Sequence, residues 1–105
     1  MLTDTIKRFE ESQPGTTSFM AFADGCLATA EQDSENAAAL ILLAMAAREF
    51  VDQVQDQPLS LPEAEAGRDR LIGQARKVAA SANGDAGEKL AVANRIALDQ
   101  IGQSR

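Results

Sequence analysis

Alanine accounts for 20 of the 105 residues, and the other apolar residues recur mostly at spacings of three and four. Alanine is the best helix former, whereas the β-branched and aromatic residues that favour strands are sparse in this chain. No alternation of apolar and polar residues lasts as much as six positions. These features predict an all-α fold, and the length predicts a single helical domain, residues 1–105.

Apolar periodicity and capping residues predict five helices. The expected ranges are 3–12, 16–32, 34–57, 60–82 and 85–101. The expected N-caps are Thr16 or Thr17, Asp33 or Ser34, Ser60 and Asp85. Ser60 and Asp85 are each followed by Glu at the third helical position, which is the pattern of a capping box. Asn83-Gly84 predicts a left-handed cap at the end of the fourth helix.

The short turns between these ranges predict a small antiparallel bundle of four helices plus a short N-terminal helix. Phe22, Leu43, Phe50 and Ile72 are expected in its core. Residues 43–54 also resemble residues 90–101, with matching Leu-Ala, Arg and Asp-Gln positions at a spacing of 47. This similarity leaves open two duplicated helical hairpins, since the period lies in the range of helical repeats. Leu90, Ala93, Ala97 and Ile101 are expected along the apolar face of the last helix.

The segment Ala37–Ala47 is apolar on every side. A helix of this kind is normally surrounded by protein, and a few short partners cover only part of its circumference. We therefore expect a second copy of the chain to cover the rest, giving a homodimer. The predicted contact residues are Leu40, Leu43 and Ala47 of this segment, with Arg70 and Lys77 on a basic face of the helix that follows.

The charge is unevenly distributed along the chain. The net charge is −6, with −9 in residues 1–65 and +3 in residues 66–105. The two halves should attract each other, within one chain or between two copies in a two-fold arrangement whose rim is weakened by salt. The acidic balance disfavours direct binding to nucleic acid. The 11-residue apolar run is too short for a membrane span, and a single Cys26 fits a reducing compartment, so we expect a cytoplasmic protein.

The residues present restrict the available chemistry. The chain has no His, so a His general base or His metal ligand is excluded. Cys26 lies on an apolar helix face without a base, which indicates a buried hydrophobe. Gly84–Lys89 lacks the spacing of a phosphate-binding loop. We predict no catalytic, cofactor-binding or metal-ligating residue, and no cofactor.

The combined features favour a non-enzymatic protein that acts by contact with other proteins, as an adaptor, a regulator or a chaperone-like subunit. One alternative is a Mg²⁺-dependent all-α hydrolase, because Glu49 and Asp52 share a helix face and carboxylates bind Mg²⁺. All-α nucleoside triphosphate pyrophosphatases use Glu-x-x-Glu before such a pair, whereas Glu31 and Glu35 are four apart. Another alternative is an acidic mimic of nucleic acid, built from the acidic residues in 24–65.

Overall fold

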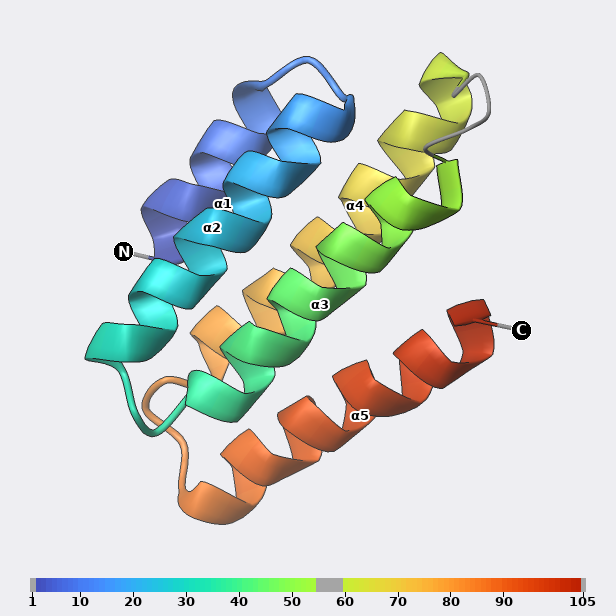
Figure 1. Cartoon of the computed structure of the whole chain (residues 1–105). Coiled ribbons are helices and arrows are strands. Elements are labelled where there is room, and N and C mark those ends of the chain that lie inside the picture. The colour runs from blue at the N-terminus through green and yellow to red at the C-terminus, as the bar shows by residue number, and fades with distance from the viewer. Residues whose placement is uncertain (1, 55–59, 105) are drawn as a thin grey trace.

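The computed structural model describes residues 2–54 and 60–104, which form five α-helices and no strand (Figure 1). The helices are α1 (Leu2–Glu11), α2 (Thr16–Gln32), α3 (Ala37–Val54), α4 (Leu61–Ala80) and α5 (Ala86–Ser104). The predicted all-α class is therefore confirmed for this part of the chain. None of these helices combines the length and the apolar character that a membrane crossing requires.

Two helix starts agree with the capping residues in the sequence. The Ser60 Oγ accepts a hydrogen bond from the Glu63 backbone N–H at 3.3 Å, and α4 begins at the next residue. The Asp85 Oδ1 accepts one from the Glu88 N–H at 2.8 Å, and α5 begins at Ala86. Both N-cap predictions are confirmed. α5 continues past the predicted end at Ile101 to Ser104, so the polar residues 102–104 also belong to the helix.

Two other starts differ from the prediction. α2 is preceded by Gly15, whose N–H donates to the Ser18 Oγ at 3.1 Å, so neither threonine is the cap. α3 begins at Ala37, about one turn later than expected. The delay has a local cause, because Asn36 is held in a turn: its backbone N–H donates to the Asp33 carbonyl and its side-chain amide donates to the Asp33 carboxylate at 2.9 Å. The expected end of this helix near Gln57 lies outside the described residues.

The expected left-handed cap at Asn83-Gly84 is wrong. α4 ends earlier, at Ala80, and no residue in 2–54 or 60–104 has a positive φ. Ser81 ends the helix instead. Its backbone N–H donates to the Lys77 carbonyl at 3.1 Å, and its hydroxyl donates to the Val78 carbonyl at 2.8 Å. The Ser81 side chain thus satisfies a terminal carbonyl that a glycine cap would otherwise serve.

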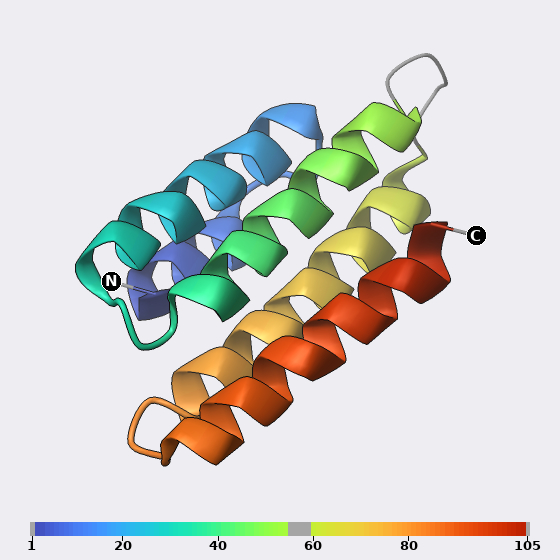
Figure 2. The same ribbon diagram turned by 60° about the horizontal axis from the view of Figure 1, so that its bottom comes forward.

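α3 is the central helix of the fold, because α2, α4 and α5 all pack against it (Figures 1 and 2). α1 completes the packing by contacting α2 and α4. The core joins aromatic side chains from the first three helices to alanine and aliphatic side chains from α3, α4 and α5. Phe22, Leu43 and Ile72 are buried as predicted, whereas Phe50 is only half-buried. The Phe50 ring stacks on the fully buried Phe19, with 4.5 Å between ring centroids.

Gly67 allows α4 to approach Phe50 of α3 closely. A Cβ atom at Gly67 would lie 2.8 Å from Cε2 and 2.9 Å from Cζ of the Phe50 ring. Gly73 on the same helix has no such neighbour within 4 Å. The hydrogen in place of a side chain at Gly67 is therefore part of the packing of α4 against α3.

α5 begins at the same end of the molecule as α3 and runs beside it. Near their starts, the Lys89 Nζ pairs with the Glu35 carboxylate at 2.5 Å. Near their far ends, the Gln100 Nε2 donates to the Glu49 Oε2 at 2.5 Å. α5 also lies beside α4, as Figure 2 shows, where the Gln74 amide donates to the Asp99 carboxylate at 3.3 Å.

Candidate interaction surface

The apolar side chains that remain outside the core gather mainly on two helices. Seven large apolar residues are exposed in the described part of the chain, and five of them belong to α3 and α5. Their exposed fractions are 43% for Ile41, 58% for Met45, 61% for Leu90, 61% for Leu98 and 53% for Ile101. We define the α3–α5 surface as these five residues together with the exposed Ala38.

Helical spacing explains why these residues lie together. Ala38, Ile41 and Met45 are three and four residues apart, so they form one stripe along α3. Leu90 and Ile101 are eleven apart, which is close to three full turns, so they lie on one side of α5. The contacts of α5 with Glu35 and Glu49 hold it beside α3 at both ends. The two stripes therefore border the groove that runs between α3 and α5.

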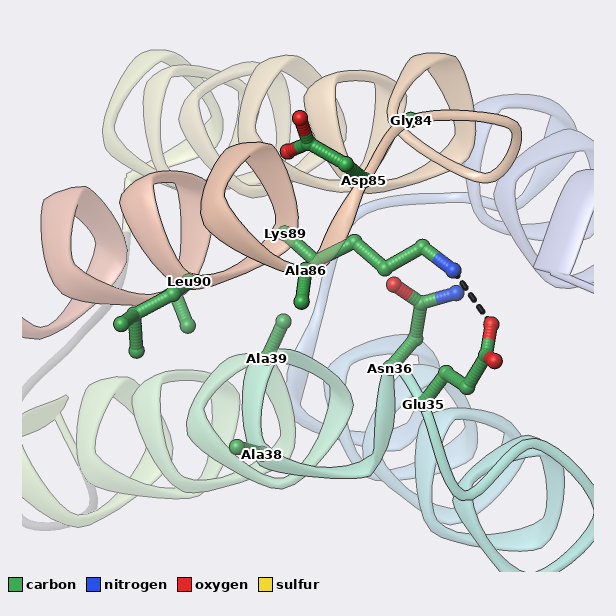
Figure 3. A pocket seen from close by; sticks show the side chains of 10 residues that line it. Glu35, Asn36, Ala38, Ala39, Gly84, Asp85, Ala86, Lys89 and Leu90 are labelled. Atoms are coloured by element: carbon green, nitrogen blue, oxygen red, sulfur yellow. Dashed lines mark hydrogen bonds and ion pairs between the residues drawn. The ribbon is translucent and has the colours of Figure 1, made fainter.

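A cavity of about 430 Å³ opens at the start of this groove (Figure 3). Its walls combine small and apolar side chains of α3 and α5 with the two turns that precede these helices. The residues named in Figure 3 include Ala38, Ala39, Ala86 and Leu90 on the apolar side. The cavity is continuous with the α3–α5 surface, since Ala38 and Leu90 belong to both.

The polar end of the cavity holds a buried amide and an ion pair. Lys89 extends along the cavity to Glu35, and its side chain is only 11% exposed (Figure 3). Asn36 is 5% exposed, its Nδ2 donates to Asp33, and its Oδ1 has no hydrogen-bond partner. Lys89 and Glu35 thus mark the border between the apolar groove and the acidic turn before α3.

The structure places three of the predicted contact residues inside the chain's own core. Leu40, Leu43 and Ala47 each have 0% exposure, so they have no surface to offer to a partner. The surface of the same helix is carried by Ile41 and Met45. The sequence could not show which side of Ala37–Ala47 faces outward, because every side of this segment is apolar and so carries no polar marker of solvent.

The predicted basic residues lie elsewhere. Lys77 is exposed near the end of α4, and Arg70 is half-buried in the middle of that helix. Two neighbouring arginines contact α1 or the residue that follows it within the same chain. Arg76 pairs with Glu10 at 2.6 Å, and the Arg68 Nη1 donates to the Ser12 carbonyl at 3.2 Å. Part of the attraction between the acidic and basic halves is therefore satisfied inside one chain.

The structure places the residues considered for chemistry in separate surroundings. Glu49 accepts a hydrogen bond from Gln100, while Asp52 is exposed. Residues 2–54 and 60–104 contain no group of three or more acidic or cysteine side chains placed to hold a metal ion. Cys26 has 0% exposure, and this burial raises the pKa of its thiol to about 12.

Comparisons with protein-family models, with curated proteins and with solved structures find no match to this chain. The α3–α5 surface is consequently the feature from which a function can be inferred. Exposed apolar patches on a small protein mark places where proteins, membranes or ligands bind.

Proposed function

We propose that this protein is a non-enzymatic helical subunit that acts by protein–protein contact, as an adaptor, a regulator or a chaperone-like subunit, and that it forms a homodimer. The observation that supports this proposal is the α3–α5 surface. Two adjacent helices carry five large apolar side chains at about half exposure, on a chain whose surface is otherwise strongly acidic. A partner that covers this surface removes these side chains from water.

The expected gain can be estimated from the exposed fractions. Full burial of a Leu, Ile or Met side chain is worth about 1.5–3 kcal/mol, so burying the remaining half is worth roughly 1 kcal/mol for each. Two copies that cover each other's five side chains would then gain on the order of 10 kcal/mol. Association costs about 4–15 kcal/mol in lost freedom of motion. At the low end of this cost the net gain is about 6 kcal/mol, which corresponds to a dimer with a dissociation constant of tens of micromolar rather than an obligate one.

Light scattering on the full chain, at concentrations from micromolar to several hundred micromolar, tests this proposal. We expect a mass of about twice the 11.1 kDa of the monomer. Met45→Glu should shift the mass toward the monomer, because it places a charge in the α3–α5 surface. Leu61→Glu is the matched control: Leu61 is 54% exposed, close to the 58% of Met45, but it lies at the start of α4. A wild-type mass near 11 kDa at all accessible concentrations would contradict the homodimer.

We also propose the finer features of the architecture. In this proposal α2 to α5 form an antiparallel bundle with α1 as the short N-terminal helix, and the bundle contains two duplicated hairpins. The side-by-side placement of α3 and α5, which hold the similar segments 43–54 and 90–101, supports the duplication. The partner is then another protein chain rather than nucleic acid or a membrane, and the location is the cytoplasm, where Cys26 stays a thiol.

A further inference from the structure

The outward side of α5 carries a repeating set of uncharged residues. We call this set the α5 stripe: Gly87, Leu90, Ala91, Asn94, Ala97, Leu98 and Ile101. All are exposed except Ala97, which is half-buried. The spacings of three and four between successive rows are those of a coiled-coil face. None of the seven side chains is charged, although the chain as a whole carries a net charge of −6.

The sizes of these side chains are complementary about the middle of the stripe. When an identical helix is placed antiparallel with its centre on Asn94, each row meets another row of the same set. Gly87 then faces Ile101, Leu90 faces Leu98, and each alanine lies beside a leucine of the other copy, Ala91 beside Leu98 and Ala97 beside Leu90. A parallel pairing would instead place Gly87 against Gly87 and leave a gap where two hydrogens meet. The antiparallel pairing fills each small position with a larger side chain or with a matched one, as close packing requires.

We propose that a second copy of this chain docks along the α5 stripe, with the two α5 helices antiparallel and the two-fold axis passing through Asn94. This inference rests on the proposed homodimer and names the surface that forms it. An isologous interface must be complementary to itself, and the α5 stripe meets this condition residue by residue. Ile41 and Met45 of α3 extend the apolar area beside the stripe.

Asn94 has a specific role in this arrangement. An Asn side chain has both a donor and an acceptor, so two copies that meet on a two-fold axis can exchange a reciprocal pair of hydrogen bonds. A shift of the helices by one turn would separate the two amides and bury each against apolar side chains. A single polar residue of this kind in a coiled-coil seam fixes the register and the orientation of the helices.

The charges explain why two acidic chains can meet on this side. The nearest charged neighbours on α5 are Glu88 and Arg95, which lie about 100° around the helix from Gly87 and Asn94 and so border one edge of the stripe. Two copies that approach through the α5 stripe therefore meet through uncharged side chains, with the charged residues at the edge of the contact, where water reaches them. The acidic residues Asp24 and Asp52 lie on α2 and α3, outside the stripe.

Disulfide cross-linking tests the position of the two-fold axis. Helices that pack 8–10 Å apart bring facing Cα atoms to roughly 4–5 Å, which is within the range that a disulfide spans. We expect Asn94→Cys to form a covalent dimer under mild oxidation at micromolar concentration. Arg95→Cys is the matched control, since it is the next residue on the same helix, is exposed and lies about 100° around the helix from Asn94. We expect at least a tenfold slower cross-linking for this control.

The native thiol does not interfere, because Cys26 is fully buried. Both altered positions are exposed, so helix content measured by circular dichroism should stay unchanged. A second measurement avoids any change at the axis itself. A mixture of Ala91→Cys and Leu98→Cys chains should cross-link mainly between the two variants, because residue 91 lies beside residue 98 of the other copy, and much more slowly between identical chains.

The outcomes separate this inference from the proposed homodimer. If wild-type protein is a dimer by light scattering but Asn94→Cys cross-links no faster than Arg95→Cys, and the mixed variants show no preference, the α5 stripe is not the interface and the homodimer proposal stands. A wild-type monomer that cross-links at none of these positions overturns both. Fast, selective cross-linking in both measurements supports the two-fold axis at Asn94.

Discussion

Replacing Gly67 by Ala tests the close approach of α4 to α3. Gly67 is buried, and the added methyl carbon would lie 2.8–2.9 Å from two atoms of the Phe50 ring. Ordinary carbon–carbon contacts are about 3.5–4.0 Å, so the ring or the helix must move. The ring cannot retreat toward the core, because it stacks on Phe19 at 4.5 Å and Phe19 is fully buried. Any relief therefore weakens this aromatic contact or separates the two helices.

The change in the free energy of unfolding has two opposing parts. Gly to Ala inside a helix stabilises by about 0.8–1 kcal/mol through helix propensity. Overpacking of a close contact costs about 1–3 kcal/mol. We expect Gly67→Ala to be less stable than the wild type by roughly 0–2 kcal/mol. Gly73→Ala, on the same helix with open space around the added atom, should be more stable by roughly 0.5–1 kcal/mol.

Urea denaturation followed by circular dichroism measures both variants. The comparison between them is more informative than either alone, because the propensity gain is shared and the contact with Phe50 is not. We expect Gly73→Ala to exceed Gly67→Ala by about 1–3 kcal/mol, which for a domain of this size is a difference in Tm of several degrees. Equal stabilisation by the two substitutions would refute the close packing of α4 against Phe50.

Two further predictions concern the core. Leu43→Ala removes a side chain with 0% exposure and should reduce the free energy of unfolding by about 2–5 kcal/mol in the same urea assay; a loss below roughly 0.5 kcal/mol, the level of surface substitutions, would show that Leu43 is not in the core. Burial raises the pKa of Cys26 from 9.0 to about 12, so the folded state keeps the neutral thiol while the unfolded thiol ionises above about pH 9. The contribution of this thiol to stability is therefore complete below pH 9 and is lost as the pH rises toward 12. Cys26→Ala should show a smaller loss of stability over that interval, and the native thiol should react with a thiol reagent at pH 8 only as fast as the chain unfolds.

Capping residues and apolar spacing were sufficient to predict that five helices form and where two of them begin, because both act locally. Ser60 and Asp85 determine where α4 and α5 begin through hydrogen bonds three residues away. The start of α3 could not be predicted in the same way. Asn36 is itself a good N-cap residue, but two others precede it, and only the contacts of Asn36 with Asp33 decide between them.

The exposed surface was harder to predict than the helices. On α5 the buried residues are Ala93 and Ile96, whereas the pattern predicted a face that includes Leu90 and Ile101, which are exposed. An apolar stripe that binds a partner has the same spacing as one that faces the core, so periodicity alone cannot distinguish them. The choice depends on which side α3 and α4 occupy, and that is a property of the assembled fold.

The sparse burial of α5 has a consequence for the dynamics of the chain. Within residues 86–102 only Ala93 and Ile96 are buried and Val92 packs partly against the core, while the other contacts named above are polar ones through Lys89, Asp99 and Gln100. A helix held in this way opens with a lower free energy than the helices around the core. Its backbone amides should exchange with deuterium faster than those of α2 and α3. Pairing of two α5 helices would slow this exchange as the protein concentration rises, so that association completes the folding of the last helix.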